Sequence, residues 1–100
     1  MKVAFPTEDG KTVSKHFGRS NYFLIYDTET KEKKLVENPH GKQRDVMGHV
    51  KLLKLLLKEG VSKVVCWNIG MRMREDLKEA GIKVELTDEL DIPKCLGDKT

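Results

Sequence analysis

The strongest constraint on the fold is an apolar repeat between residues 46 and 59. Apolar side chains recur there every three or four positions, the spacing that places them on one face of an α-helix. The repeat consists of Val46, Val50, Leu53 and Leu57, and it is widened by Leu52, Leu55 and Leu56. Gly60 follows directly and is the residue type that most often ends a helix. The pattern predicts a helix over residues 46–59 with one face against a core.

Short apolar segments on either side of this helix have the composition of β-strands. They are rich in β-branched and aromatic residues, and Gly, Pro, Asn or Asp residues separate them. The predicted strands cover residues 2–6, 21–27, 32–37, 62–66 and 82–86. A second helix is predicted at 71–80, where Gly81 ends it, and the tail 87–96 is expected to form one short helix limited by Pro93.

The order of these elements predicts an α/β fold. The second and third strands are close enough in sequence to form an antiparallel hairpin through residues 28–31. The rest of the chain alternates helix and strand with short connections, which favours parallel strands joined by right-handed crossovers. A chain of 100 residues has room for one hydrophobic core. We therefore expect a single domain that spans residues 1–100.

Charge and cysteine content argue against several classes of protein. The 19 basic residues are interleaved with 16 acidic ones, so the net charge is only +3 and no basic stripe indicates a nucleic-acid partner. No segment approaches the roughly 20 apolar residues that span a bilayer, and the N-terminal apolar segment is too short for a signal peptide. Cys66 and Cys95 lie far apart in sequence. We expect a cytoplasmic protein with reduced thiols and no membrane partner, while the oligomeric state stays open.

Ligands of α/β proteins bind in the loops beyond the carboxyl ends of parallel strands. Three loops qualify here: residues 6–20, residues 67–71 and the segment after Leu86. The second of these, Trp67-Asn68-Ile69-Gly70-Met71, leads into a predicted helix N-terminus, whose free N–H groups attract anions. The same turn can equally be a plain connection between a strand and a helix. Asn68 and Gly70 are its candidate binding residues.

Two side chains near these loops could bind a metal. His16 follows the first strand in a glycine-containing loop, where an imidazole can bind a metal or donate a hydrogen bond that fixes the loop. Cys66 ends an apolar strand, and it is either a buried small hydrophobic residue or a thiolate at the loop edge. Participation of His40, His49 and Cys95 stays open, although packing is the simplest role for Cys95.

Enzyme motifs are missing from the sequence. It contains neither the G-x-S-x-G turn of a serine hydrolase nor the H-E-x-x-H of a zinc protease. The acidic residues of the second predicted helix, Glu75, Asp76 and Glu79, have the spacing of a solvated face. We expect a protein that binds a ligand without catalysis.

Several motifs resemble those of the dinitrogenase iron–molybdenum cofactor-binding family, the small domains similar to nitrogenase accessory proteins. The resemblance spans nearly the whole chain, and its most specific part is His16-Phe17-Gly18-Arg19 after the first strand. The other matching segments are Met1–Thr7, Asp9-Gly10, Val13–Lys15, Ser20, Tyr22–Ile25, Glu37–Pro39, Lys58–Val61, Ile69-Gly70 and Glu79–Val84. The resemblance implies a ribonuclease H-like fold, with a mixed sheet of about five strands flanked by helices, and no hydrolase activity.

The resemblance also implies a carrier of iron–molybdenum cofactor or a related metal–sulfur cluster, which cofactor-assembly proteins would load or unload. In that hypothesis His16 and Cys66 approach the metal, while Arg19 and the helix N-terminus near Gly70 balance the charge of the cluster. The alternatives are a phosphate- or nucleotide-binding regulatory module that uses the same loops, and a protein-interaction adaptor with an apolar patch around Trp67. The first hypothesis requires the first and fourth strands to be neighbours, which the sequence does not force.

Overall fold

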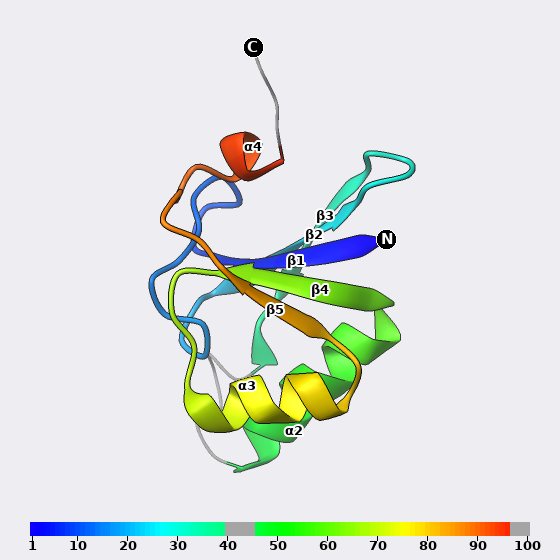
Figure 1. Cartoon of the computed structure of the whole chain (residues 1–100), viewed down its shortest axis with the longest axis vertical. Helices are drawn as coiled ribbons and strands as arrows, with labels where there is room; N and C mark the ends of the chain where they lie inside the picture. The colour runs from blue at the N-terminus through cyan, green and yellow to red at the C-terminus, as the bar shows by residue number, and fades with distance from the viewer. Residues whose placement is uncertain (40–45, 97–100) are drawn as a thin grey trace.

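Five strands form one mixed sheet in the computed structural model, which describes residues 1–39 and 46–96. The strand order is β3-β2-β1-β4-β5, with β1 in the centre (Figure 1). The strands are β1 (Lys2–Thr7), β2 (Tyr22–Asp27), β3 (Lys33–Glu37), β4 (Val61–Cys66) and β5 (Lys83–Leu86). β1 pairs antiparallel with β2 and parallel with β4. The prediction of a mixed five-stranded sheet with flanking helices is confirmed.

The two longer helices lie where the apolar repeats place them, and the expected tail helix is shorter than residues 87–96, with Pro93 in its first turn. The helices are α2 (Val46–Lys58), α3 (Met71–Glu79) and the short α4 (Ile92–Cys95) in the tail. The β2–β3 connection is the expected antiparallel hairpin, and β4 and β5 are parallel neighbours. The predicted loop before α2 falls largely on residues 40–45, which lie outside the described residues together with His40. In the part of the chain that is described, no helix has the length and apolar character needed to cross a membrane.

One face of the sheet packs against α2 and α3. Leu52 and Leu56 of α2 and Leu77 of α3 are fully buried there. They contact the strand residues whose side chains point to that face, which include Ala4, Phe23, Ile25, Val64 and Cys66. Figure 1 shows both helices on the same side of the sheet. Burial of this apolar surface is the main contribution that α2 and α3 make to stability.

The opposite face is covered by the loop after β1 and by the C-terminal segment. Alternate strand residues such as Val3, Phe5 and Val65 point to this side and pack against Val13 and Ile92. Two backbone hydrogen bonds join the covering segments: the Val13 N–H donates to the Leu90 carbonyl at 2.7 Å, and the Ile92 N–H donates to the Lys11 carbonyl at 2.9 Å. Figure 1 shows α4 across the sheet from α2 and α3. The sheet therefore has a core on both faces.

Candidate functional site: a pocket between the loops after β1 and β4

The central pairing of β1 with β4 determines where the candidate loops lie. The two strands are parallel, with Val3 opposite Lys63 and Ala4 opposite Val64. Their carboxyl ends consequently lie at the same edge of the sheet, and the loop after each strand starts from that edge. The adjacency required by the sequence-based hypothesis is present in the structure.

These two loops line an open pocket of about 270 Å³. The first loop contributes Lys15, His16, Phe17, Gly18 and Arg19, and the second contributes Asn68, Ile69 and Gly70. Six of the seven predicted binding residues are therefore brought together, and Cys66 is not among those that line the pocket. Lys15 and Ile69 belong to the lining as well, although sequence reasoning did not single them out. Both could have been predicted, because each is adjacent in sequence to a predicted binding residue, Lys15 to His16 and Ile69 to Gly70.

The loop after β1 holds His16 at the surface by anchoring the residues beside it. Phe17 is only 3% exposed and packs edge-on against Phe23 of β2, with the ring centroids 5.1 Å apart. The Ser14 hydroxyl accepts a hydrogen bond from the His16 N–H at 3.1 Å. The imidazole of His16 is exposed, whereas its backbone and the next side chain are fixed. The loop thus places the imidazole at the rim of the pocket, and the side chain of Phe17, not that of His16, packs into the core.

A buried amide from the end of β3 supports the same loop. Asn38 is 1% exposed, and its Nδ2 donates to the Ser20 carbonyl at 2.8 Å and to the Gly18 carbonyl at 3.4 Å. The Ser20 hydroxyl in turn donates to the Phe17 carbonyl at 3.2 Å. In the sequence Asn38 is distinguished only as part of the Glu37–Pro39 motif, and that motif does not predict this positioning role. A buried polar side chain is stable only when it is hydrogen-bonded, and here the bonds define the path of the loop.

The loop after β4 leads directly into the N-terminus of α3. Gly70 is the N-cap in an extended conformation (φ −66°, ψ 145°), and no side chain of the described residues caps the helix. The first intrahelical bond of this turn is donated by the Arg74 N–H to the Gly70 carbonyl at 3.0 Å. The N–H groups of residues 71–73 therefore have no carbonyl partner within the helix. No acidic residue lies in this first turn, so its partial positive charge is not neutralised locally.

Two cationic side chains line the pocket, and no carboxylate is among the described residues that line it. Lys15 and Arg19 line the pocket on one side and the α3 N-terminus lies on the other. The Glu8 carboxylate accepts a hydrogen bond from the Ser14 hydroxyl at 3.2 Å and another from the Asn21 N–H at 3.2 Å. The electrostatic character of the pocket is therefore that of an anion site.

Cys66 points away from this pocket into the core beneath α2 and α3. It is 0% exposed and belongs to the apolar cluster on the helix-covered face. Burial raises the pKa of its thiol to about 11, although the positive charge of Arg74 lowers it slightly. A thiol in this state is neutral at physiological pH and packs as a small apolar group. The geometry favours the packing interpretation of Cys66 over the ligand interpretation.

The remaining histidine and cysteine of the described residues lie at other places. The His49 Nε2 and the Asp76 Oδ2 are 2.6 Å apart, which links α2 to α3. Cys95 donates from its Sγ to the Glu89 carbonyl at 3.2 Å and packs against the core of the other face. Within residues 1–39 and 46–96, no three His, Cys, Asp or Glu side chains gather as metal ligands.

Trp67 lies beside the pocket and connects the two loops. It is 40% exposed, and the Lys15 Nζ lies 5.5 Å from the centroid of its ring, within the range of a cation–π interaction. Met71, at the start of α3, is 78% exposed. These two side chains are the exposed apolar surface on which an adaptor function would depend.

Comparison with known proteins agrees with the fold. An uncharacterised protein of Methanocaldococcus jannaschii is 29% identical over 99 residues, which cover 96% of this chain and 82% of that protein. The crystal structure of PH0822 is similar with a TM-score of 0.80 and 34% identity, over 97% of this chain and 87% of that one. The apo form of the orange protein from Desulfovibrio gigas shares the fold, with a TM-score of 0.83 and 23% identity over 96% of this chain and 83% of that one.

The sequence profile of one family covers almost the whole chain. The family is described as dinitrogenase iron–molybdenum cofactor, and its match extends over residues 1–97. The matched range includes the His16 loop, the β4–α3 turn and every strand of the sheet. This chain therefore belongs to the dinitrogenase iron–molybdenum cofactor family.

Proposed function

We propose that the chain is a non-catalytic carrier that binds an anionic metal–sulfur cluster, iron–molybdenum cofactor or a related one, in the pocket between the β1 and β4 loops. The observation that carries the proposal is the convergence of Lys15, His16, Arg19 and the uncapped α3 N-terminus on one open pocket. Membership of the family supports the choice of cargo. The cluster is cargo in this proposal, and it is exchanged with the proteins that assemble or use it.

The charge of the pocket supports an anionic cargo. Lys15, Arg19 and the partial charge of the helix N-terminus all attract negative charge, and they would repel a bare metal cation. A metal–sulfur cluster with net negative charge is attracted by the same groups and exposes metal atoms that an imidazole can bind. Backbone N–H groups at the start of α3 can in addition donate hydrogen bonds to sulfur or oxygen atoms of the cluster.

His16 is the side chain that would contact a metal directly. Its imidazole is exposed at the pocket, and neutral imidazole nitrogen is a common ligand of transition metals. Phe17 and Ser14 fix the backbone on both sides of it, so that little ordering is required when the cargo binds. Cys66 is the second ligand candidate, but it would have to leave the core to reach the cargo.

The test is anaerobic reconstitution of the wild type with iron, molybdate and sulfide, followed by gel filtration and measurement of metal per folded protein. His16→Ala should lower the retained metal at least about tenfold, while the melting temperature changes by less than about 2 °C, because an exposed imidazole contributes little to the core. Visible absorption on the same samples should report the cluster in the wild type. Equal metal content in the wild type and in His16→Ala would remove His16 from the proposal.

Cys66→Ala is the matched variant, because it removes the other candidate ligand. We expect it to retain metal like the wild type and to lower the free energy of unfolding by about 1 kcal/mol, since a small cavity replaces a buried sulfur. Loss of metal in Cys66→Ala at unchanged fold would instead assign the thiol to the site.

The two alternatives predict different outcomes of the same experiment. A phosphate- or nucleotide-binding module would stay colourless and would gain thermal stability from nucleotide or phosphate through the same pocket. An adaptor that uses Trp67 and Met71 would bind neither the metal components nor nucleotide. Colourless protein without metal therefore contradicts the carrier proposal, and nucleotide stabilisation then separates the two alternatives.

A further inference from the structure

A second pocket lies on α3 beside the edge strand β5, and it shares no residue with the candidate cargo pocket. It has a volume of about 250 Å³ and is lined by Arg74, Lys78, Ile82, Lys83 and Val84. We call it the α3–β5 groove. Arg74 and Lys78 are four residues apart on α3, which places them one turn apart on the same face of the helix. The groove is thus lined by three basic residues and two apolar ones.

The basic side chains of the α3–β5 groove have no acidic partners among residues 1–39 and 46–96. In the part of the chain that the structure describes, no carboxylate forms an ion pair with Arg74, Lys78 or Lys83. Two nearby carboxylates are already paired, Asp76 with His49 at 2.6 Å and Glu85 with Lys63 at 2.9 Å. The positive charge that lines this groove is therefore not compensated by an ion pair with a described carboxylate, although Glu75 and Glu79 are exposed on the same helix.

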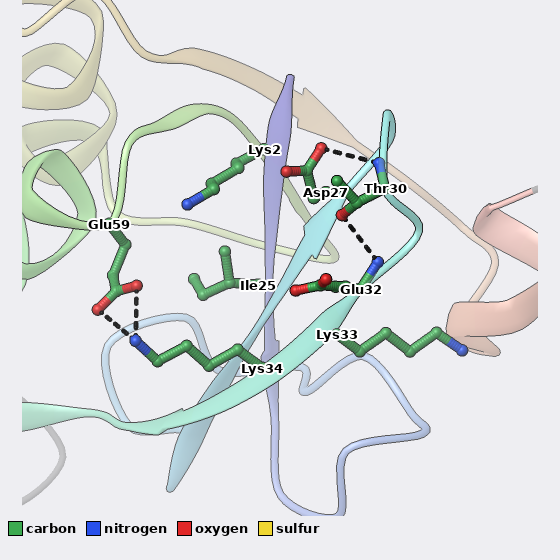
Figure 2. A pocket seen from close by; sticks show the side chains of 8 residues that line it. All are labelled: Lys2, Ile25, Asp27, Thr30, Glu32, Lys33, Lys34 and Glu59. Atoms are coloured by element: carbon green, nitrogen blue, oxygen red, sulfur yellow. Dashed lines mark hydrogen bonds and ion pairs between the residues drawn. The ribbon is translucent and has the colours of Figure 1, made fainter.

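A third pocket in the same molecule provides a comparison. It has a volume of about 150 Å³ at the β2–β3 hairpin, and Figure 2 shows its lining. Three lysines line it, but so do three carboxylates, and the Lys34 Nζ lies 3.0 and 3.1 Å from the two oxygens of Glu59. Its charges balance one another. The α3–β5 groove has as many basic residues and no carboxylate, which makes it the one of the two suited to an anion.

The apolar side of the groove indicates that the anion has an apolar part. Val84 is half-buried and provides the accessible apolar surface between the helix and the edge strand, whereas Ile82 is only 2% exposed and belongs to the core. The tight connection from α3 holds them in place, since the Ile82 N–H donates to the Leu77 carbonyl at 2.8 Å and the Gly81 N–H donates to the Lys78 carbonyl at 3.1 Å. An apolar group that covers this surface is removed from water when it binds.

We propose that the α3–β5 groove binds an organic phosphate, with the phosphate group at Arg74 and Lys78 and the organic part against the exposed surface of Val84. A phosphate monoester carries close to two negative charges at neutral pH and accepts several hydrogen bonds, which suits a guanidinium and an ammonium group together. A carboxylate has one charge and satisfies fewer of these donors. The proposal does not depend on the cluster-carrier function, because the two pockets have different linings.

The test uses phenyl phosphate as the probe in a titration of isotope-labelled full-length protein, followed by NMR of the backbone amides. We expect shifts at Arg74, Lys78 and residues 82–84, and affinity at least about tenfold above that of inorganic phosphate or benzoate. Shifts confined to residues 15–19 and 68–70 would place the phosphate in the cargo pocket and overturn the proposal. Equal affinity for the three probes would overturn it as well.

Two double variants test whether specific cations are needed. Arg74→Gln with Lys78→Gln should lower the affinity for phenyl phosphate at least about tenfold. Lys54→Gln with Lys58→Gln is the matched control, because these exposed lysines have the same four-residue spacing on α2 and line neither pocket. The control should bind like the wild type. Equal loss in both double variants would mean that only the net charge matters, which contradicts a defined site.

Discussion

The carboxylate of Asp9 organises the turn that follows β1. Its Oδ1 accepts hydrogen bonds from the Lys11 and Thr12 N–H groups, both at 2.8 Å, and the Thr7 hydroxyl lies at 3.2 Å from the same oxygen. These bonds, the one from Lys11 first, hold the pKa of Asp9 below its ordinary value of 3.8. The turn is thus stabilised by the ionised form of one exposed residue.

Asp9 should make the stability of the protein depend on pH in the acid range. Because its folded pKa is lowered, its contribution is present above pH 3.8 and is lost as the pH falls through the folded pKa. The difference in free energy of unfolding between the wild type and Asp9→Asn should therefore be larger at about pH 6 than at about pH 2, measured by urea denaturation. Asp88→Asn is the control, since Asp88 is exposed and its carboxylate forms no hydrogen bond in the described structure. A difference that stays constant with pH would contradict this role.

The two cysteines should differ in reactivity. Cys66 is fully buried with a pKa near 11, whereas Cys95 is half-buried, although burial raises its pKa too. Only the thiolate reacts with disulfide reagents, so an aromatic disulfide at about pH 8 should label Cys95 first. In Cys95→Ala, the native protein should be nearly unreactive until denaturant is added. Rapid labelling of native Cys95→Ala would show that Cys66 is accessible.

At the scale of elements, the glycines at the two ends of α3 differ in the backbone conformation that they adopt. Gly81 ends α3 with φ 83°, and a Cβ there would meet no atom within 4 Å. Gly70 begins α3 with φ −66°, and a Cβ there would also meet open space. The two positions therefore differ in backbone conformation and not in crowding.

Gly81→Ala should destabilise the protein by about 1–2 kcal/mol, because an L-residue is strained in the left-handed region. Gly70→Ala should change the free energy of unfolding by less than about 0.5 kcal/mol, since the lower entropy of the unfolded chain offsets a weaker cap. Chemical denaturation of both variants measures the difference. Equal costs would show that the left-handed conformation of Gly81 is not what limits stability.

Most elements could be predicted from sequence, because apolar periodicity is a local property. The repeat of α2 and the strand segments needed no knowledge of the rest of the chain. The side to which Cys66 points could not be predicted, because its neighbours Val64 and Val65 are apolar as well and both faces of the sheet are buried. The contact of Lys15 with Trp67 depends on the pairing of strands that are far apart in sequence.

At the scale of the whole molecule, the C-terminal segment supports the loop that bears His16. Residues 90–92 bond to Lys11 and Val13, and Ser14, the next residue, donates from its N–H to the Pro6 carbonyl at 2.7 Å. Ile92 is 1% exposed beneath this contact. The candidate cargo pocket is therefore coupled to a part of the chain that does not line it.

Ile92→Ala should weaken this support and lower the free energy of unfolding by about 2–3 kcal/mol, because a fully buried side chain is removed. Hydrogen exchange at the Val13 and Ser14 amides should accelerate more than exchange in α2, as local opening becomes easier. Lys94→Ala, an exposed position of the same helix, is the control and should leave exchange unchanged. Uniform acceleration across the molecule would indicate that the tail contributes only to global stability.

The hydrogen bonds between residues 90–92 and the loop after β1 also have a consequence for synthesis on the ribosome. Translation proceeds from the N-terminus, so β1 and the His16 loop emerge long before the residues that bond to them. The antiparallel pairings of β1, β2 and β3 lie within residues 2–37 and can form early, whereas the loop acquires its last partners only when residues 90–92 have left the ribosome. A nascent chain would therefore be unable to hold the loop in its final position until residues 90–92 have emerged from the ribosome.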